Sequence, residues 1–204
     1  MSTKSVTVEA EGRCESVPDL ATIEAYAIGE GESAYDARSI AKDRTSTIQE
    51  SITAISIDQI RTVEVQVQDT DEMFDPATDA SFQATERFYI ECLPKNAESV
   101  VIDIANAGGQ IQTVQFGFHT DTLRELQNKA IDLAMDRARE KAEQMAAAEG
   151  YAVKEMQKAA TTDVNAGFEN ITEEILASNP DTDLHPAPMT VSEGIDAVYK
   201  LSQE

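Results

Sequence analysis

The chain opens with two segments in which apolar and polar residues alternate. Residues 5–11 (SVTVEAE) and 20–30 (LATIEAYAIGE) follow a period of two, and Pro18 and Asp19 stand between them. Such alternation is typical of strands with one buried face, and a proline next to an aspartate favours a turn. The sequence therefore predicts two adjacent strands at the start of the fold.

A long amphipathic helix is predicted next. Ser33 occupies the position of an N-cap, and Asp36 stands at the box position three residues later. Apolar residues then recur at helical spacing as far as about residue 55, namely Ala37, Ile40, Ala41, Ile48, Ile52 and Ile55. We expect a helix over this stretch, directly after the hairpin.

Residues 60–69 (IRTVEVQVQD) show the cleanest alternation in the chain. Val63, Val65 and Val67 fall on one face of a strand, and the opposite face carries Glu64, Gln66 and Gln68. A strand with this pattern is exposed to water on one side only.

The second half of the chain continues with strands and helices. Strands are predicted at 82–92, 111–118, 153–161 and 190–201, and the last one has to return to the sheet. A shorter helix begins at Pro94 or Asn96 and ends before Gly108 and Gly109, and a long helix capped by Thr120 or Asp121 ends at Gly150.

Residues 162–188 differ in kind from the rest. Prolines and acidic residues interrupt any regular element there, which predicts a long mobile excursion. Four apolar residues within it have the spacing of one short helix: Phe168, Ile171, Ile175 and Leu176.

The long helix before Gly150 combines an apolar stripe with an unusual charge balance. Residues 121–158 hold eight acidic and seven basic residues, a net charge of −1 in a chain whose net charge is −22. Small residues permit close approach of another element. Two interpretations stay open: a packed or intersubunit helix, or a solvated helix stabilised by local ion pairs. The stripe comprises Leu123, Leu126, Ala130, Leu133, Ala134, Ala138, Ala142, Met145 and Ala146, and the interface candidates are Arg137, Ala138, Lys141, Ala142 and Met145.

The overall charge restricts the possible partners. The chain has 38 acidic and 16 basic residues, a pI near 4.3, and carboxylates scattered singly rather than in a block. In molar salt the Debye length is about 3 Å, so carboxylates stop repelling one another while they keep the surface hydrated. We interpret the composition as adaptation to a halophilic cytosol, because a nucleic-acid mimic or an acidic tail would concentrate the charge. The chain has no basic stripe, so we expect no nucleic-acid binding.

The start of the chain shows no charged segment followed by an apolar run, and no window approaches the roughly 18 apolar residues of a membrane span. We therefore expect a cytoplasmic protein that does not insert into a membrane. Cys14 and Cys92 lack CxxC spacing and a neighbouring histidine, so we interpret them as ordinary thiols.

Five segments, taken in order, resemble the SIMPL domain family, which is widespread and has a poorly defined biochemistry. The first is Val6 to Val8 with Glu11 and Gly12, followed by Pro18, Asp19 and Ala21. The others are Asp58, Ile60 and Thr62; Ala107 and Gly108 with Gln115 to Phe118; the helix residues Ala130, Ala134, Asp136, Arg137, Ala138, Lys141, Ala142 and Glu143 with Gly150; and Val191, Ser192, Ile195, Ala197, Val198, Tyr199 and Leu201.

This resemblance implies a single α+β domain over residues 1–204, with a mixed, largely antiparallel sheet and long helices packed on it. Some members of the family assemble into rings or larger oligomers. Bacterial relatives are mostly periplasmic or envelope proteins associated with stress tolerance, and an animal relative binds a signalling kinase. The resemblance carries over no catalytic residue and no cofactor.

A survey of reactive residues yields few candidates. His119 and His185 have no cysteine or second histidine at ligand spacing, and the chain has no GxSxG motif. Gly29, Glu30 and Gly31 lack the further glycine and the lysine of a phosphate loop, so we interpret them as a flexible turn. The acidic loop 69–79 could gather carboxylates from Asp69, Asp71, Asp75 and Asp79, but Phe74 and Ala80 occupy the positions where a calcium hand needs glycine and glutamate.

Three functional hypotheses follow. We favour a non-enzymatic homo-oligomer or protein-interaction module, with no cofactor and a role related to stress. The first alternative is a protein that binds divalent cations weakly through the loop 69–79. The second is a hydrolase-type enzyme that uses His119 with a nearby carboxylate.

Overall fold

The computed structural model describes residues 4–53, 59–72, 79–162 and 186–203. The described residues gather in two compact units: unit 1 comprises residues 4–17, 118–162 and 187–203, and unit 2 comprises residues 18–53, 59–72, 79–117 and 186. Each unit is a sheet with helix packed on it, which confirms the α+β class. The single domain over 1–204 stays a prediction, and most of the expected excursion, residues 163–185, lies outside the described residues.

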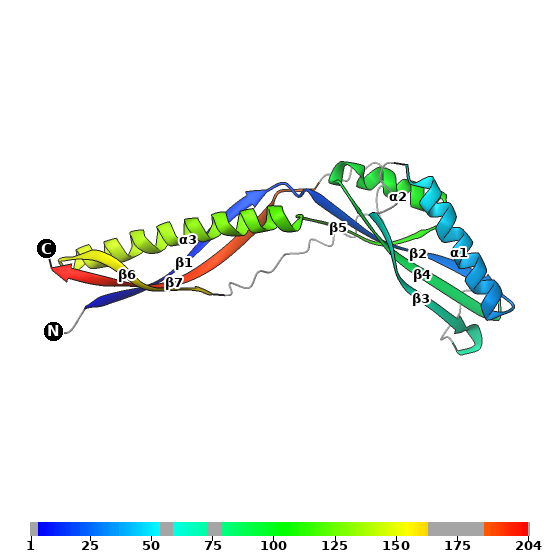
Figure 1. Cartoon of the computed structure of the whole chain (residues 1–204), viewed down its shortest axis with the longest axis horizontal. Helices are drawn as coiled ribbons and strands as arrows, with labels where there is room; N and C mark the ends of the chain where they lie inside the picture. The colour runs from blue at the N-terminus through cyan, green and yellow to red at the C-terminus, as the bar shows by residue number, and fades with distance from the viewer. Residues whose placement is uncertain (1–3, 54–58, 73–78, 163–185, 204) are drawn as a thin grey trace. The chain divides into compact units, whose positions relative to one another are not determined.

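Unit 1 is a three-stranded sheet with one long helix. Its strands are β1 (Ser5–Ser16), β7 (Met189–Gln203) and β6 (Tyr151–Thr162), in the order β1-β7-β6, and both pairings are antiparallel. Helix α3 (Thr120–Ala148) lies along this sheet (Figure 1). The last strand does return to pair with the first, from Ser5 opposite Lys200 to Ser16 opposite Met189.

Helix α3 meets its sheet through alanines spaced four residues apart: Ala130, Ala134, Ala138, Ala142 and Ala146 are all buried. Ala134, Ala138 and Ala142 pack on a core that includes Val8, Ile195 and Tyr199. Leu133 and Met145, which the sequence placed on the same stripe, are exposed. A row of i, i+4 positions is inclined to the helix axis, and such a row can follow a twisted strand where a straight stripe cannot.

Gly12 of β1 lies against the backbone of α3. A Cβ at this position would stand 1.8 Å from the carbonyl oxygen of Ala130 and 2.6 Å from the nitrogen of Ala134. Only a residue without a side chain allows this approach, so Gly12 and the alanine row together set how closely α3 packs on the sheet.

Unit 2 is a four-stranded antiparallel sheet with two helices. Its strands are β3 (Ile60–Asp69), β4 (Phe82–Cys92), β2 (Leu20–Gly31) and β5 (Gln110–Gly117), in the order β3-β4-β2-β5. The predicted hairpin of the first two strands is therefore wrong, because β1 pairs with β7 and β2 pairs with β4 and β5 in another sheet. Helices α1 (Ala34–Ser51) and α2 (Ala97–Asn106) contribute to one core with the central strands β2 and β4. Its largest fully buried side chains are Phe88, Ile23, Ile48, Ile90, Ile104 and Val100.

Helix α1 begins as expected but ends earlier. The Ser33 hydroxyl accepts a hydrogen bond from the backbone nitrogen of Asp36 at 3.2 Å, which confirms the N-cap. The helix ends at Ser51 rather than near residue 55, because Ile52 is already extended. Ile40, which the apolar spacing predicts to be buried, is exposed, and Thr45 is buried instead. The Thr45 hydroxyl donates a hydrogen bond to the Ala41 carbonyl at 3.1 Å.

The remaining helix ends differ slightly from the sequence expectation. Pro94–Asn96 form a short 3-10 turn that leads into α2, and Gly108 after it has a φ of 82°, as a left-handed stop requires. His119, not Thr120 or Asp121, is the N-cap of α3. None of the described helices is long and apolar enough to span a membrane.

Candidate interaction surfaces

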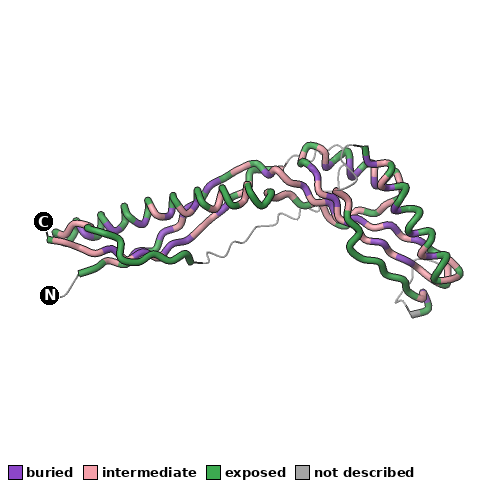
Figure 2. The backbone as a smooth tube through the Cα atoms, viewed as in Figure 1, coloured by how far each residue is buried: buried purple, intermediate pink, exposed green. Residues whose placement is uncertain are grey.

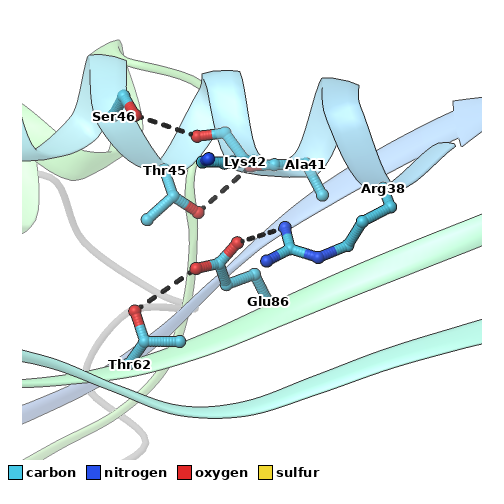
Figure 3. A network of polar contacts seen from close by, with 7 residues as sticks. All are labelled: Arg38, Ala41, Lys42, Thr45, Ser46, Thr62 and Glu86. Atoms are coloured by element: carbon cyan, nitrogen blue, oxygen red, sulfur yellow. Dashed lines mark hydrogen bonds and ion pairs between the residues drawn. The ribbon is translucent and has the colours of Figure 1, made fainter. Parts of the chain in front are cut away.

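A buried carboxylate connects three elements of unit 2. Glu86 of β4 is 6% exposed; its Oε2 accepts a hydrogen bond from Arg38 Nη1 at 2.8 Å, and its Oε1 accepts one from Thr62 Oγ1 at 3.3 Å (Figure 3). Arg38 comes from α1 and Thr62 from β3. A buried carboxylate is costly unless it is paired and hydrogen-bonded. These contacts therefore hold α1 and β3 in place on β4.

The same contacts reveal a bulge that the sequence did not predict. Thr62 pairs with Phe88 and Glu64 pairs with Arg87, so Val63 is the extra residue between them. Val65 and Val67 then lie opposite Glu86 and Ala84. Residues directly opposite in a sheet share a face, so Thr62, Val65 and Val67 lie on the face that carries α1.

The valines of β3 are nevertheless exposed: Val63 by 48%, Val65 by 45% and Val67 by 40%. Helix α1 packs mainly on β2 and β4 and touches β3 less, and β3 is exposed along most of its length (Figure 2). The prediction that only one face of this strand is wet is therefore wrong. The alternation was correct evidence for a strand but could not show that α1 stops short of the edge.

The opposite face of this sheet carries a charge cluster. Arg87 Nη1 contacts Glu24 at 3.0 Å, and Arg87 Nη2 contacts Glu64 at 2.6 Å. Glu64 thus has a cation partner within the chain, which it shares with Glu24.

Four of the five interface candidates of α3 face their own sheet or bind it. Ala138 and Ala142 are fully buried within unit 1. Arg137 Nη1 donates a hydrogen bond to the Glu11 carbonyl at 2.7 Å, and Lys141 Nζ donates one to the Glu9 carbonyl at 2.8 Å. Met145 is 53% exposed. A contact of these residues with another subunit stays a prediction, and Met145 is the one with the most accessible side chain.

The acidic loop gives no assembled cation site among the residues that the structure describes. Asp69 Oδ1 accepts a hydrogen bond from the backbone nitrogen of Asp71 at 3.0 Å, which is a local turn contact. Asp79 is exposed, and Asp75 lies outside the described residues. Within the described ranges no three potential metal ligands come together. Cation binding by this loop stays a prediction.

The structure describes one of the two histidines, His119, and the glycines Gly29 and Gly31. His119 is the N-cap of α3, and its carbonyl oxygen accepts a hydrogen bond from the backbone nitrogen of Leu123 at 2.9 Å. His185 lies outside the described residues. Gly29 to Gly31 are part of β2, not a turn. A Cβ on Gly29 would stand 2.2 Å from the Ala37 carbonyl oxygen, so this glycine permits close packing of α1.

Glu11 and Cys92 are among the ionisable groups on the strands whose pKa values are shifted. Arg13 donates two hydrogen bonds of 2.8 Å to the Glu11 carboxylate and holds the pKa of Glu11 below its usual range. Burial raises the pKa of the Cys92 thiol to about 11. Cys92 and Cys14 are both free and buried, as expected of ordinary thiols.

Comparison with known proteins identifies the family. A family model described as SIMPL, protein of unknown function (DUF541), matches residues 6–199. The chain belongs to the SIMPL family. No curated protein matches it. A solved structure, the regulatory subunit of aspartate kinase from Thermus flavus, is 12% identical over 94% of this chain and 89% of that chain, but a TM-score of 0.20 carries no argument about fold or function.

The SIMPL match runs through both units, from β1 to Tyr199 in β7. Several residues that carried the resemblance have clear packing roles here. Gly12 admits α3, Gly108 ends α2, and Ile195, Ala197 and Tyr199 are buried in the core of unit 1. These residues of the resemblance therefore build the fold.

Proposed function

We propose that this SIMPL chain is a non-enzymatic, oligomer-forming interaction module. The observation that supports the proposal best is the outer edge of β3, where three valines are 40–48% exposed at the end of a sheet. Among the described residues, no strand pairs with this edge. Unpaired N–H and C=O groups beside apolar side chains form a template for another strand.

The charge of the chain sets the conditions in which such association occurs. Two copies, each with a net charge of −22, repel each other in dilute buffer. In about 2 M salt this repulsion is screened within a few ångströms, whereas apolar burial persists. Salt adaptation is part of the proposal, and oligomerisation should increase with salt.

Light scattering coupled to size exclusion tests the proposal. In about 2 M salt, where surface charges are screened, we expect a mass that is a multiple of the 22.2 kDa monomer. The same sample in about 0.1 M salt, where the Debye length is about 10 Å, is the matched control and should show a smaller mass. A strictly monomeric mass in high salt at every protein concentration would overturn the proposal.

A further inference from the structure

Resting on this proposed function, we propose that the occupant of the β3 edge is β3 of a second copy of the chain. The two strands pair antiparallel about a two-fold axis that passes through Gln66, so that the two sheets of unit 2 join into one. In this arrangement Val65 of each copy lies opposite Val67 of the other.

The four sheet edges of the described residues differ in how they are protected. Two backbone carbonyls of β1 accept hydrogen bonds from Arg137 and Lys141. Strand β6 carries two bulges against β7 and the lysines Lys154 and Lys158. Strand β5 has eight residues and its own bulge against β2. Bulges, lysines and short strands are the usual means by which sheet edges avoid pairing.

Strand β3 has less of this protection. Its bulge lies near its start, at Val63, and from Glu64 to Asp69 its pairing with β4 is regular. This regular stretch has no lysine and no proline, and Val65 and Val67 are its apolar side chains. The stretch is therefore the best template for a further strand in unit 2.

Symmetry restricts the register. A two-fold axis perpendicular to an antiparallel pair passes between identical residues and keeps both α1 helices on the same side of the joined sheet. Three other registers are unfavourable. An axis at Val67 would place Val65 opposite the carboxylate of Asp69, and an axis at Glu64 would bring two carboxylates together. An axis at Val65 would place the bulge residue Val63 opposite Val67.

An axis at Gln66 keeps these conflicts out of the paired stretch Glu64–Gln68, because the bulge residue Val63 and Asp69 then meet only beyond its two ends. Each Val65 then faces a Val67, and each Glu64, already paired with Arg87, faces the neutral side chain of Gln68. The two copies thus cover each other's exposed valines without placing like charges opposite each other. Pairs of β-branched side chains across strands stabilise a sheet.

Disulfide trapping tests both the partner and the register. Directly opposite residues in an antiparallel pair have Cα atoms about 4.5–5.5 Å apart, within the roughly 4.4–6.8 Å that a disulfide spans. We expect Gln66→Cys to yield a covalent dimer after diamide oxidation in about 2 M salt, a condition that screens the charges. Native Cys14 and Cys92 are buried, and mass spectrometry of the linked peptides identifies the bridge.

Gln68→Cys is the matched control. It replaces the same residue type on the same face of the same strand, but the two Gln68 residues would lie four positions apart along the pair, about 13 Å. It should therefore give little covalent dimer. Equal or greater crosslinking of Gln68→Cys would overturn the register.

Val65→Glu provides a measurement that does not depend on oxidation. Because Val65 is already 45% exposed, the variant should keep the circular dichroism of the wild type. It places a carboxylate opposite Val67 of the other copy, and we expect the dimer dissociation constant to rise about tenfold or more.

The outcomes separate the two proposals. Crosslinking of Gln66→Cys together with weakened association of Val65→Glu supports the β3 pair. Oligomers that persist in Val65→Glu, with no crosslink through Gln66→Cys, would refute the β3 pair and leave the oligomeric function intact, since another surface would then hold the copies. A wild type that stays monomeric would refute both.

Discussion

Replacing Gly12 by alanine should weaken unit 1 far more than a glycine-to-alanine change normally does. The new Cβ would stand 1.8 Å from the Ala130 oxygen and 2.6 Å from the Ala134 nitrogen, well inside van der Waals contact. Both atoms belong to the backbone of α3, so no side chain can rotate away. Relief requires α3 to move off β1, which loosens the contact of its alanine row with Val8.

Overpacking of a well-packed site costs about 1–3 kcal/mol, and a clash with helix backbone belongs at the upper end, about 3 kcal/mol. In a chain of this size, 1 kcal/mol shifts Tm by about 2–4 °C, so we expect Gly12→Ala to lower the melting temperature of the chain by about 6–12 °C. Thermal melting followed by circular dichroism in high salt measures the shift.

Gly117→Ala is the control, because a Cβ there has no atom within 4 Å. It adds the same methyl group and the same restriction of the unfolded chain, without the clash. If Gly12→Ala melted within about 2 °C of Gly117→Ala, at most about a third of the expected shift, the close packing of α3 on β1 would be refuted.

Three further predictions follow from the described contacts and the charge. Arg38→Met should destabilise unit 2 by about 2 kcal/mol in chemical denaturation, because it leaves the buried Glu86 carboxylate without its cation. The double variant with Glu86→Leu should recover much of this loss, and an unchanged denaturation midpoint for Arg38→Met would contradict the role of Arg38. A pKa near 11 in place of 9.0 lowers the thiolate fraction of Cys92 at pH 8 about 100-fold, so iodoacetamide should label Cys92 far more slowly in the folded than in the unfolded chain. The stability that the buried neutral thiol contributes should be lost as the pH rises from 9.0 to about 11. Fast labelling of the folded protein would argue against this burial. Dialysis to about 0.01 M salt, where the Debye length is about 30 Å, should reduce the helical circular dichroism, because the net charge of −22 is then unscreened; full retention of the signal would remove the case for salt adaptation.

The strands and helices of this fold are largely readable from the sequence, because alternation and helical spacing are local properties. Which positions of α3 are buried is less readable. Leu133 and Met145 match a straight apolar stripe, yet the twisted sheet of unit 1 meets the inclined alanine row instead. The twist of a partner element is not a local property of the helix sequence.

Strand β3 shows a second limit. One extra residue at Val63 moves Thr62 to the face that the alternation assigned to the valines, where it joins Glu86 and Arg38. No residue type at this position marks a bulge, since valine and threonine are ordinary strand residues. The exposure of the valines depends further on where α1 crosses the sheet, which is a property of tertiary packing.

The near-neutral charge of α3 has a physical role in a chain this acidic. Arg137 and Lys141 donate hydrogen bonds to backbone carbonyls of β1, an edge strand, rather than to carboxylates. Molar salt screens the attraction between two charges, but a hydrogen bond to a neutral carbonyl loses less by screening. Basic residues placed in this way remain useful under conditions that weaken surface ion pairs, and they bind two backbone carbonyls of this edge strand. In the dimer that we propose, a second copy covers the outer edge of β3, with which no strand of the described residues pairs.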